Sequence, residues 1–432
     1  MKTITYEAAE EQTETVSVWL MAVLEYIKDT PLFRWLEQVQ VDMKTVRYSP
    51  LNKAQTMIAS VVMGCKHTKD INEVLSQEIA AANYLGMARF PDQSQINRYL
   101  TRFTAGNVAQ LREAHAHLFM QQSQARRAAG SIVVDMDQCG LVANGKTYEF
   151  ARRGYFPRKR GEQGYQVSAA YVGAYEEALQ LYLDPGNVVG KTRLGDLLRD
   201  IDRLLATDNP GVTVIRRLDA GYDSAENRCL LAQLPGYFLL KSAQSGAAAA
   251  RAASIPVQQW LPVAEGVHGT ELPPANGLRY LVYELALSDG TWDYAMLITN
   301  LPASEFGVLR LFAFYNERQT IEAFFCQARQ VFHIHTLRSR QFNAIEAFLG
   351  FVFLTHNLLV WVRQARFAQT DLAAATMRQL VLKATRVRAQ IAWDGQWHLF
   401  VILSTHWAQR LLAALQPHCV QLELPFARLY KT

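Results

Sequence analysis

The hydrophobic periodicity of this chain changes at Ser131, and that change most constrains the fold. Before it, apolar residues recur at helical spacing through residues 1 to about 128, with short breaks between the helices. After it, strand patterns and helix patterns alternate. The predicted strands are 131–139, 165–173, 178–186, 212–223 and 236–242, and the predicted helices are 191–206 and 224–233. This order is typical of a mixed five-stranded sheet covered by helices.

Two further regions follow this α/β pattern. Residues 244–303 contain strand-like runs separated by Gly, Pro and Asn turns, which predicts a small all-β insertion. The chain after the insertion is mainly helical, with a short strand-like stretch at 395–403. The apolar run that starts at Ala347 contains His356 and Asn357 and is short for a membrane span, so we expect a buried helix.

Composition sets weaker limits on function. The net charge of +5, from 44 Lys and Arg against 39 Asp and Glu, permits a nucleic-acid partner but does not require one. The five cysteines are scattered and form no CxxC pair, which predicts neither a disulfide framework nor a zinc site. With an acidic N-terminus that lacks the pattern of a signal peptide, these features favour a cytoplasmic protein that is not membrane-bound.

Four acidic residues occupy positions where chemistry is often found. Asp135 and Asp137 end the first predicted strand and, at a period of two, point to one face of the sheet. Asp219 ends the predicted strand before an Ala-Gly pair. Glu322 lies in residues 315–332, which we interpret as one amphipathic helix.

That helix carries Tyr315, Arg318, Glu322 and Arg329 along one polar stripe. A simple explanation is a solvated face with an Arg318–Glu322 pair at i,i+4. Each aspartate taken alone is also an ordinary turn or cap residue. Three carboxylates that converge from two strand ends and a helix would repel one another unless they hold hard divalent cations. The set therefore favours two-metal phosphoryl-transfer chemistry.

These residues resemble the insertion-sequence transposases of the DDE type, which have an RNase H-like catalytic core. Their signature Y-(2)-R-(3)-E-(6)-K matches Tyr315, Arg318 and Glu322, and Arg329 stands in place of the Lys. The segments "RRLDAGYDS" and "DMDQC" are similar to the regions of the second and first acid, with Cys139 where Thr is common.

The resemblance implies roles for these side chains. Asp137, with Asp135 as second choice, would be the first catalytic acid; Asp219 would be the second and Glu322 the third. Asp137, Asp219 and Glu322 would hold two Mg²⁺ ions, which Mn²⁺ can replace. It also implies five parts: 1–128, a helical DNA-binding domain; 129–243, the first part of the core; 244–305, the insertion; 306–365, the second part of the core; and 366–432, a mainly helical region.

The function implied is cut-and-paste transposition by a bacterial enzyme that associates with the nucleoid. Its partners would be double-stranded DNA, as terminal inverted repeats and target, and a second copy of the chain in the DNA complex. Two alternatives remain open: an inactive DNA-binding protein derived from a transposase, and an RNase H-fold nuclease that does not join strands.

Several side chains are expected to contact DNA. Tyr315, Arg318 and Arg329 would hold the backbone at the cleaved end. Arg152, Arg153, Arg158, Lys159 and Arg160 form a basic segment after the first acid strand, and an exposed turn without function is its alternative. Arg98 and Arg102 lie on a helix that Asp92 or Ser94 would cap. Trp260 and Trp292 are candidates for base stacking, although sheet core is the commoner place for such residues.

Overall fold

The computed structural model describes residues 4–8, 16–44, 47–156, 161–205 and 211–416. They form two compact units, which are described separately. One unit is the segment Phe119–Cys326. The other combines Met1–Leu118 with Gln327–Thr432, so the two terminal parts of the sequence share one unit.

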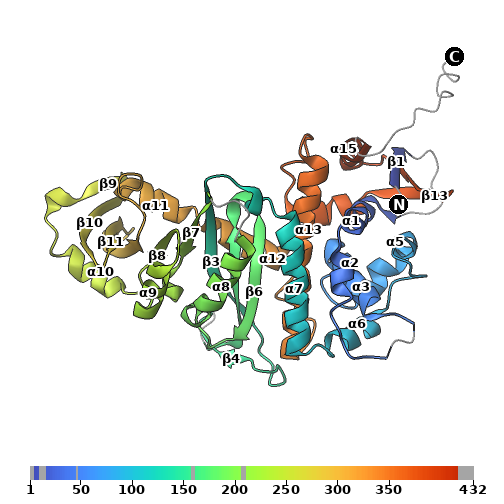
Figure 1. Ribbon diagram of the computed structural model, residues 1–432, viewed down its shortest axis with the longest axis horizontal. Coiled ribbons are helices and arrows are strands. Elements are labelled where there is room, and N and C mark those ends of the chain that lie inside the picture. Colours follow the sequence, from blue (N-terminus) through green and yellow to red (C-terminus); the bar gives the residue numbers. More distant parts are fainter. Residues whose placement is uncertain (1–3, 9–15, 45–46, 157–160, 206–210, 417–432) are drawn as a thin grey trace, which may run out of the picture. The chain divides into compact units, whose positions relative to one another are not determined.

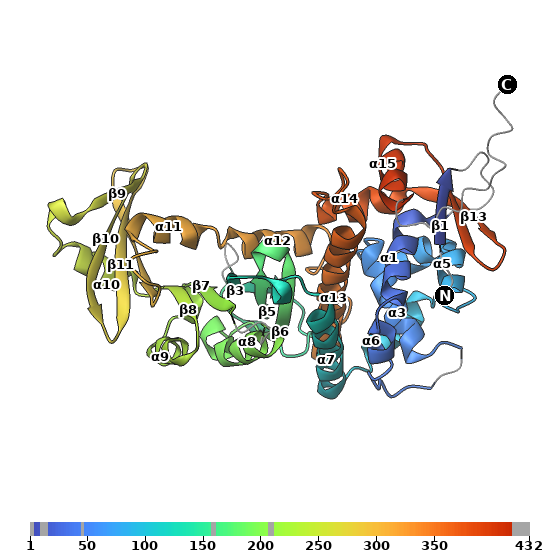
Figure 2. The same ribbon diagram turned by 45° about the horizontal axis from the view of Figure 1, so that its top comes forward.

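The unit 119–326 is built on one long mixed sheet (Figures 1 and 2). Its central strands run in the order β6-β5-β3-β7-β8. The first three pair antiparallel, whereas β7 and β8 run parallel to β3. This is the RNase H-like arrangement, and the predicted mixed sheet is confirmed. The strands are β3 (Ser131–Val142), β4 (Arg152–Arg153), β5 (Gln163–Val172), β6 (Glu177–Pro185), β7 (Thr213–Leu218) and β8 (Tyr237–Lys241).

Helices join the parallel strands, as the alternating pattern predicts. Helix α8 (Gly190–Leu205) buries Leu194, Leu197 and Ile201 and packs against β5 and β6. Helix α9 (Ala225–Gln233) connects the short turn η4 (Ala220–Tyr222) to β8. Because both crossovers bring the chain back parallel, the carboxyl end of β7 lies beside the middle of β3, where Leu218 pairs with Met136.

The insertion extends the same sheet instead of forming a separate one. Strand β12 pairs antiparallel with β8, and β11, β10 and β9 follow outward. The insertion is not all-β, because the Ala-rich run forms helix α10, as expected from the high helix propensity of Ala. The elements are α10 (Ser245–Ala252), η5 (Val257–Gln259), β9 (Leu261–Ala264), β10 (Val267–Ala275), β11 (Leu278–Ala286) and β12 (Trp292–Thr299).

The core of this unit continues from the central strands into the insertion. Ile215 and Leu239 of the parallel strands share one buried cluster with Leu281 and Leu297 of the insertion. Helix α11 (Val308–Asn316) joins that cluster through Val308 and Leu311. After the insertion, the chain therefore returns to the core through α11, which packs on the extended sheet.

The second unit is mainly helical, but it also contains a small sheet. The chain near both termini contributes to it in the order β1-β14-β13-β2, so these regions are not helical throughout. Strand β14 confirms the strand-like stretch expected after residue 395. The strands are β1 (Ile4–Ala8), β2 (Val16–Ser17), β13 (Arg388–Trp393) and β14 (Trp397–Val401).

The helices of this unit surround one apolar helix, α13 (Phe342–Phe367). It is long and apolar enough to span a membrane, but 94% of its most apolar stretch is buried inside the protein, which confirms the expected core helix. The other elements are α1 (Val18–Lys28), α2 (Leu32–Leu36), α3 (Pro50–Val62), α4 (Asp70–Val74), η1 (Leu75–Gln77), α5 (Ile79–Tyr84), α6 (Gln93–Leu100), α14 (Met377–Leu382), η6 (Ala384–Arg386) and α15 (His406–Leu415). Helix α7 (Ala105–Gln122) runs into the segment that begins the other unit, where η2 (Ala125–Arg127) follows it.

Candidate active site

The pairing of β3 with β7 brings two aspartates together. The parallel register joins Asp135 to Arg217 and Met136 to Leu218. One step further along the same register, Asp137 lies beside Asp219, which directly follows β7. Neighbouring strands are only about 4.8 Å apart, so the two carboxylates share one small region where β7 ends beside the middle of β3. The prediction that Asp135 and Asp137 end the first strand is wrong, because β3 continues to Val142 through its pairing with β5.

Their closeness has an electrostatic cost. Burial, together with the Asp137 carboxylate, raises the pKa of Asp219 to about 6. The Arg318 guanidinium and the N–H of Gly221, which donates to Oδ1 of Asp219 at 3.0 Å, only partly offset this rise. The site therefore favours a positive charge placed between or beside these two carboxylates.

Arg318 supplies such a charge. Its Nη1 lies 3.1 Å from Oδ2 of Asp137, and its Nη2 donates to Oε1 of Glu322 at 2.9 Å. Burial alone would lower the pKa of Arg318, but the Asp137 carboxylate, the Tyr315 phenol and Asp219 together raise it above its usual range. Arg318 thus links the first and third predicted acids through one guanidinium, and the i,i+4 pair with Glu322 is confirmed.

The predicted single helix over 315–332 is wrong, because it is broken at Glu317 and Arg318. Tyr315 belongs to α11, and Glu322 lies in the first turn of α12 (Gln319–Gln330). The chain tightens through hydrogen bonds from the N–H groups of Arg318 and Ile321 to residues three positions earlier. This break turns the Arg318 side chain inward, where only 8% of the residue is exposed.

Asp135 has a different environment from Asp137, although both lie on the same face of β3. Arg217 holds it in a two-pronged ion pair, with distances of 2.7 Å and 2.9 Å. Thr320 donates to the same carboxylate at 2.8 Å, and Asp135 is fully buried. Because these bonds occupy both of its oxygens, Asp135 has a structural role. It connects β3 to β7 and to the start of α12.

The predicted meeting of three carboxylates at one point is not found in this arrangement. Within the described parts of the chain, no three His, Cys, Asp or Glu side chains are close enough to hold one metal ion. Arg318 stands between Asp137 and Glu322, and the Glu322 side chain is 57% exposed. The donor chemistry of Asp137 and Asp219 fits a hard divalent cation, and Glu322 fits once it releases Arg318.

Tyr315 also lies near Arg318 and the two aspartates, as the spacing predicts. Burial raises the pKa of its phenol to about 12, whereas the nearby Arg318 charge lowers it. Arg329 is exposed in the last turn of α12, two turns beyond Glu322.

The predicted basic segment is described only in part. Arg152 and Arg153 form the exposed strand β4, which pairs with Gly164 and Gln163 of β5. The cross-strand partner of Asp137 is Ala169, five residues further along β5. At about 3.3 Å per residue this separation is roughly 16 Å, so these two arginines are not beside the acids. Arg158, Lys159 and Arg160 lie outside the described residues.

The remaining predicted contacts lie elsewhere. Arg98 and Arg102 are exposed, one on α6 and one just after it. Trp292 is 41% exposed at the start of β12, so it is not a sheet-core residue. Trp260 is half-buried where η5 ends. Their roles in binding DNA stay predictions.

Two residues near the acids were missed from the sequence. Arg217 is one, because its pairing with Asp135 depends on the register between β3 and β7, which the sequence does not state. Tyr222 is the other, a fully buried phenol within electrostatic range of Asp137 and Asp219. Burial, then these two carboxylates, raises its pKa well above the usual value. Its position in the "DAGYD" segment was the available signal.

Comparison with known proteins identifies the family. Residues 128–358 match the transposase DDE domain, which is more than half of the chain, so this protein belongs to that family. None of the curated proteins gives a match.

Among solved structures, the piggyBac transposase synaptic complex with hairpin DNA is similar, at 10% identity and a TM-score of 0.49, over 85% of this chain and 79% of that one. The Mos1 transposase paired-end complex with the left transposon end matches at 13% identity and a TM-score of 0.16, over 45% and 58% of the two chains. The mariner Mos1 paired-end complex with Mg matches at 11% identity and a TM-score of 0.16, over 52% and 77%.

The ion pair of Asp135 leads to a stability prediction. Replacement Arg217→Met leaves a buried carboxylate without its counter-charge, and we expect a loss of about 3–5 kcal/mol in the free energy of unfolding. Urea denaturation at neutral pH measures it. Arg199→Met, which removes a guanidinium that is 78% exposed, is the control and should change stability by less than about 1 kcal/mol. Equal stability of Arg217→Met and the parent would contradict a structural role for Asp135.

The raised pKa of Asp219 leads to a pH-dependent prediction. Its folded pKa of about 6 exceeds the value of 3.8 for an ordinary aspartate, so the ionised side chain destabilises the fold as pH rises through that window. In metal-free buffer, Asp219→Asn should therefore be more stable than the parent by about 1–3 kcal/mol at pH 8, and equally stable near pH 4.

Asp223→Asn is the matched control for this measurement. Arg228 pairs with Asp223 at 2.6 Å and 2.9 Å and lowers its pKa despite burial. The control should lose stability at pH 8 and recover toward the parent at low pH. A loss of stability in Asp219→Asn at pH 8 would show that Asp219 is not strained by its neighbours.

Proposed function

We propose that this chain is an active DNA transposase that cuts the ends of a bacterial insertion sequence and joins them to target DNA. The observation that carries this proposal is the in-register placement of Asp137 beside Asp219, with Glu322 tied to the same site by Arg318. Membership in the transposase DDE domain family supports it.

Asp137, Asp219 and Glu322 would hold the metal in this function, with Mg²⁺ as the resident ion and Mn²⁺ as a substitute. Two divalent cations supply activation of the attacking oxygen and stabilisation of the leaving oxygen in phosphoryl transfer. Asp137 and Asp219 offer carboxylate oxygens at one place, and their mutual repulsion would be relieved by a bound cation. Glu322 contributes after its carboxylate separates from Arg318.

Arg318 is proposed to change partners when DNA arrives. In this structure its guanidinium neutralises Asp137 and Glu322. A DNA phosphate offers two non-bridging oxygens to the planar guanidinium, so Nη1 and Nη2 can exchange two carboxylate contacts for contacts to one phosphate. Tyr315 and Arg329 would contact the same backbone, and the released 3′-OH would then attack target DNA.

The finer parts of the function are proposals too. Terminal inverted repeats and target DNA are the proposed substrates, a second copy of the chain is the proposed partner in the DNA complex, and the bacterial nucleoid is the proposed place of action. The arrangement of Arg318 between two acids also suits an inactive, DNA-binding descendant, because the pair satisfies both carboxylates without metal.

A cleavage assay distinguishes these functions. Purified protein with Mg²⁺ or Mn²⁺ should cut a labelled duplex of the element's terminal sequence and join the 3′ end to a target plasmid. Removal of a metal-holding carboxylate in Asp137→Ala, Asp219→Ala or Glu322→Ala should lower the rate by about 10³-fold or more, since a metal ion contributes several kcal/mol.

Glu305→Ala is the acidic control, because Glu305 is exposed and lies in the loop before α11. It should keep activity close to the parent. Cutting without joining would favour a nuclease, and specific end binding with intact DNA under every metal condition would leave only the inactive descendant.

A further inference from the structure

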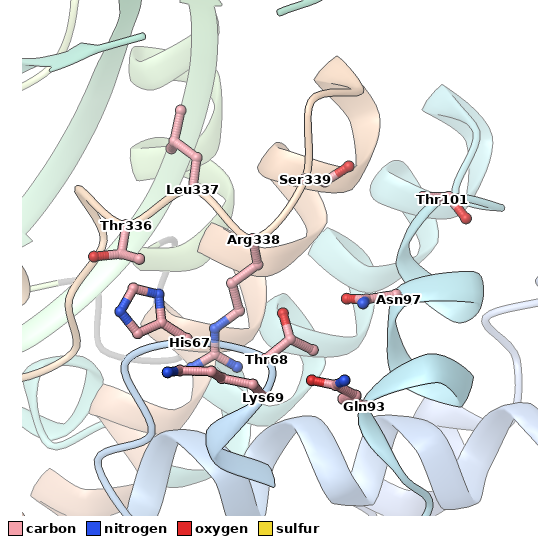
Figure 3. A pocket seen from close by; sticks show the side chains of 10 residues that line it. All are labelled: His67, Thr68, Lys69, Gln93, Asn97, Thr101, Thr336, Leu337, Arg338 and Ser339. Atoms are coloured by element: carbon pink, nitrogen blue, oxygen red, sulfur yellow. The ribbon is translucent and has the colours of Figure 1, made fainter. Parts of the chain in front are cut away.

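A pocket of about 360 Å³ lies within the unit that combines both ends of the chain (Figure 3). Three segments form it: residues 67–69 after α3, one face of α6, and residues 336–339 before α13. Its volume is at the lower end of the roughly 300–1,000 Å³ of small-molecule sites. The pocket therefore admits a ligand about as large as one nucleotide.

One wall of the pocket presents amide and hydroxyl groups. Gln93, Asn97 and Thr101 follow one another at four-residue spacing, so they form one stripe along α6. Asp92 fixes the start of this helix by accepting the N–H groups of Ser94 and Gln95, which confirms it as the N-cap. Side-chain amides offer a donor and an acceptor together, which is the pattern that base edges match.

The opposite wall is positively charged. Arg338 is only 9% exposed, and its side chain extends toward the turn that carries Lys69 (Figure 3). Its guanidinium donates to two neutral oxygens, Oγ of Ser60 at 3.0 Å and the carbonyl of Cys65. Its Nε has no hydrogen-bond partner among the described residues.

The Asp70 carboxylate, which acts on Arg338 through its charge, is already hydrogen-bonded to the backbone. Oδ2 of Asp70 accepts the N–H groups of Lys66 and His67 at 2.8 Å and 2.9 Å. Burial lowers the pKa of Arg338 to about 10, so it still carries its charge at neutral pH. The Phe348 ring, whose centroid lies 4.5 Å from the guanidinium carbon, and the Asp70 carboxylate stabilise this buried charge in part, and an anion in the pocket would stabilise it further.

We propose that this pocket binds one unstacked nucleotide of the DNA, with its phosphate at Lys69 and Arg338 and its base edge at Gln93 and Asn97. A simple anion would use the charged wall alone, whereas a nucleotide uses both walls and fills the volume. The exposed Arg98 and Arg102 lie on another face of the same helix segment, where they can follow the backbone on either side of that nucleotide. This inference rests on the proposed function for its DNA partner.

The test compares two DNA probes and two pairs of variants. Fluorescence anisotropy measures binding of a blunt duplex and of the same duplex with one unpaired 3′ nucleotide. Lys69→Ala and Asn97→Ala should weaken binding of the unpaired probe roughly tenfold, because each removes a contact to that nucleotide. Both should stay within about twofold of the parent on the blunt duplex.

Lys66→Ala and Asn83→Ala are the matched controls, since both residues are exposed and neither lines the pocket. They should bind both probes like the parent. Equal losses on both probes would make the pocket a general backbone contact and overturn the nucleotide assignment. Unchanged binding in Lys69→Ala and Asn97→Ala would overturn the site itself.

Free deoxynucleoside monophosphates form a third arm that identifies the source of the ligand. A rise in the melting temperature of the parent, absent in Asn97→Ala, would show that the pocket takes the nucleotide unit outside DNA as well. No rise, with the probe-specific loss kept, would assign the site to DNA alone. These readouts measure binding of any sequence, so a parent protein that fails to cut DNA would reject the proposed function without deciding the pocket.

Discussion

The parallel pairing of β3 with β7 is the constraint on which the candidate site depends. One register places Asp135 beside Arg217 and, two residues further, Asp137 beside Asp219. The first pair attracts and holds the two strands together, whereas the second pair repels and stores electrostatic free energy where β7 ends beside β3. A slip of one residue would exchange faces and remove both pairs at once.

Arg318 completes this arrangement from outside the sheet. The break between α11 and α12 turns it inward, and its one guanidinium neutralises carboxylates that lie on different elements. In this state the protein supplies its own counter-ion. When DNA and metal bind, the Arg318 guanidinium would be free to contact a phosphate, and the carboxylates that it leaves would be free to bind metal. The ion pairs that neutralise the acids in this structure are therefore connected with the proposed chemistry.

The alternation of strands and helices after Ser131 was predictable because each element has a clear period and short turns around it. The break at Glu317 and Arg318 was not, because the apolar stripe continues across it and only a local change of hydrogen bonding marks it. Arg217 was missed for another reason. Its pairing with Asp135 follows from the register between strands 82 positions apart, and a single sequence does not state that register.

The same limit explains the terminal regions and the pocket. The small sheet joins strands from opposite ends of the chain, which local patterns do not reveal. Lys69, Asn97 and Arg338 likewise meet only through the fold. By contrast, helix α10 could have been predicted, because its Ala-rich run has the propensity of a helix and not of a strand.

The central claim is that Asp137 and Asp219 form a cation site and that Arg318 neutralises it until a metal ion binds. A crystal structure of the protein with DNA and Mn²⁺, with the anomalous signal of the metal recorded, tests it most directly. The account predicts a manganese peak bound by both aspartates and a guanidinium withdrawn from its 3.1 Å contact with Asp137. A peak away from these carboxylates, or an Arg318 still paired with Asp137 while metal is bound, would contradict it.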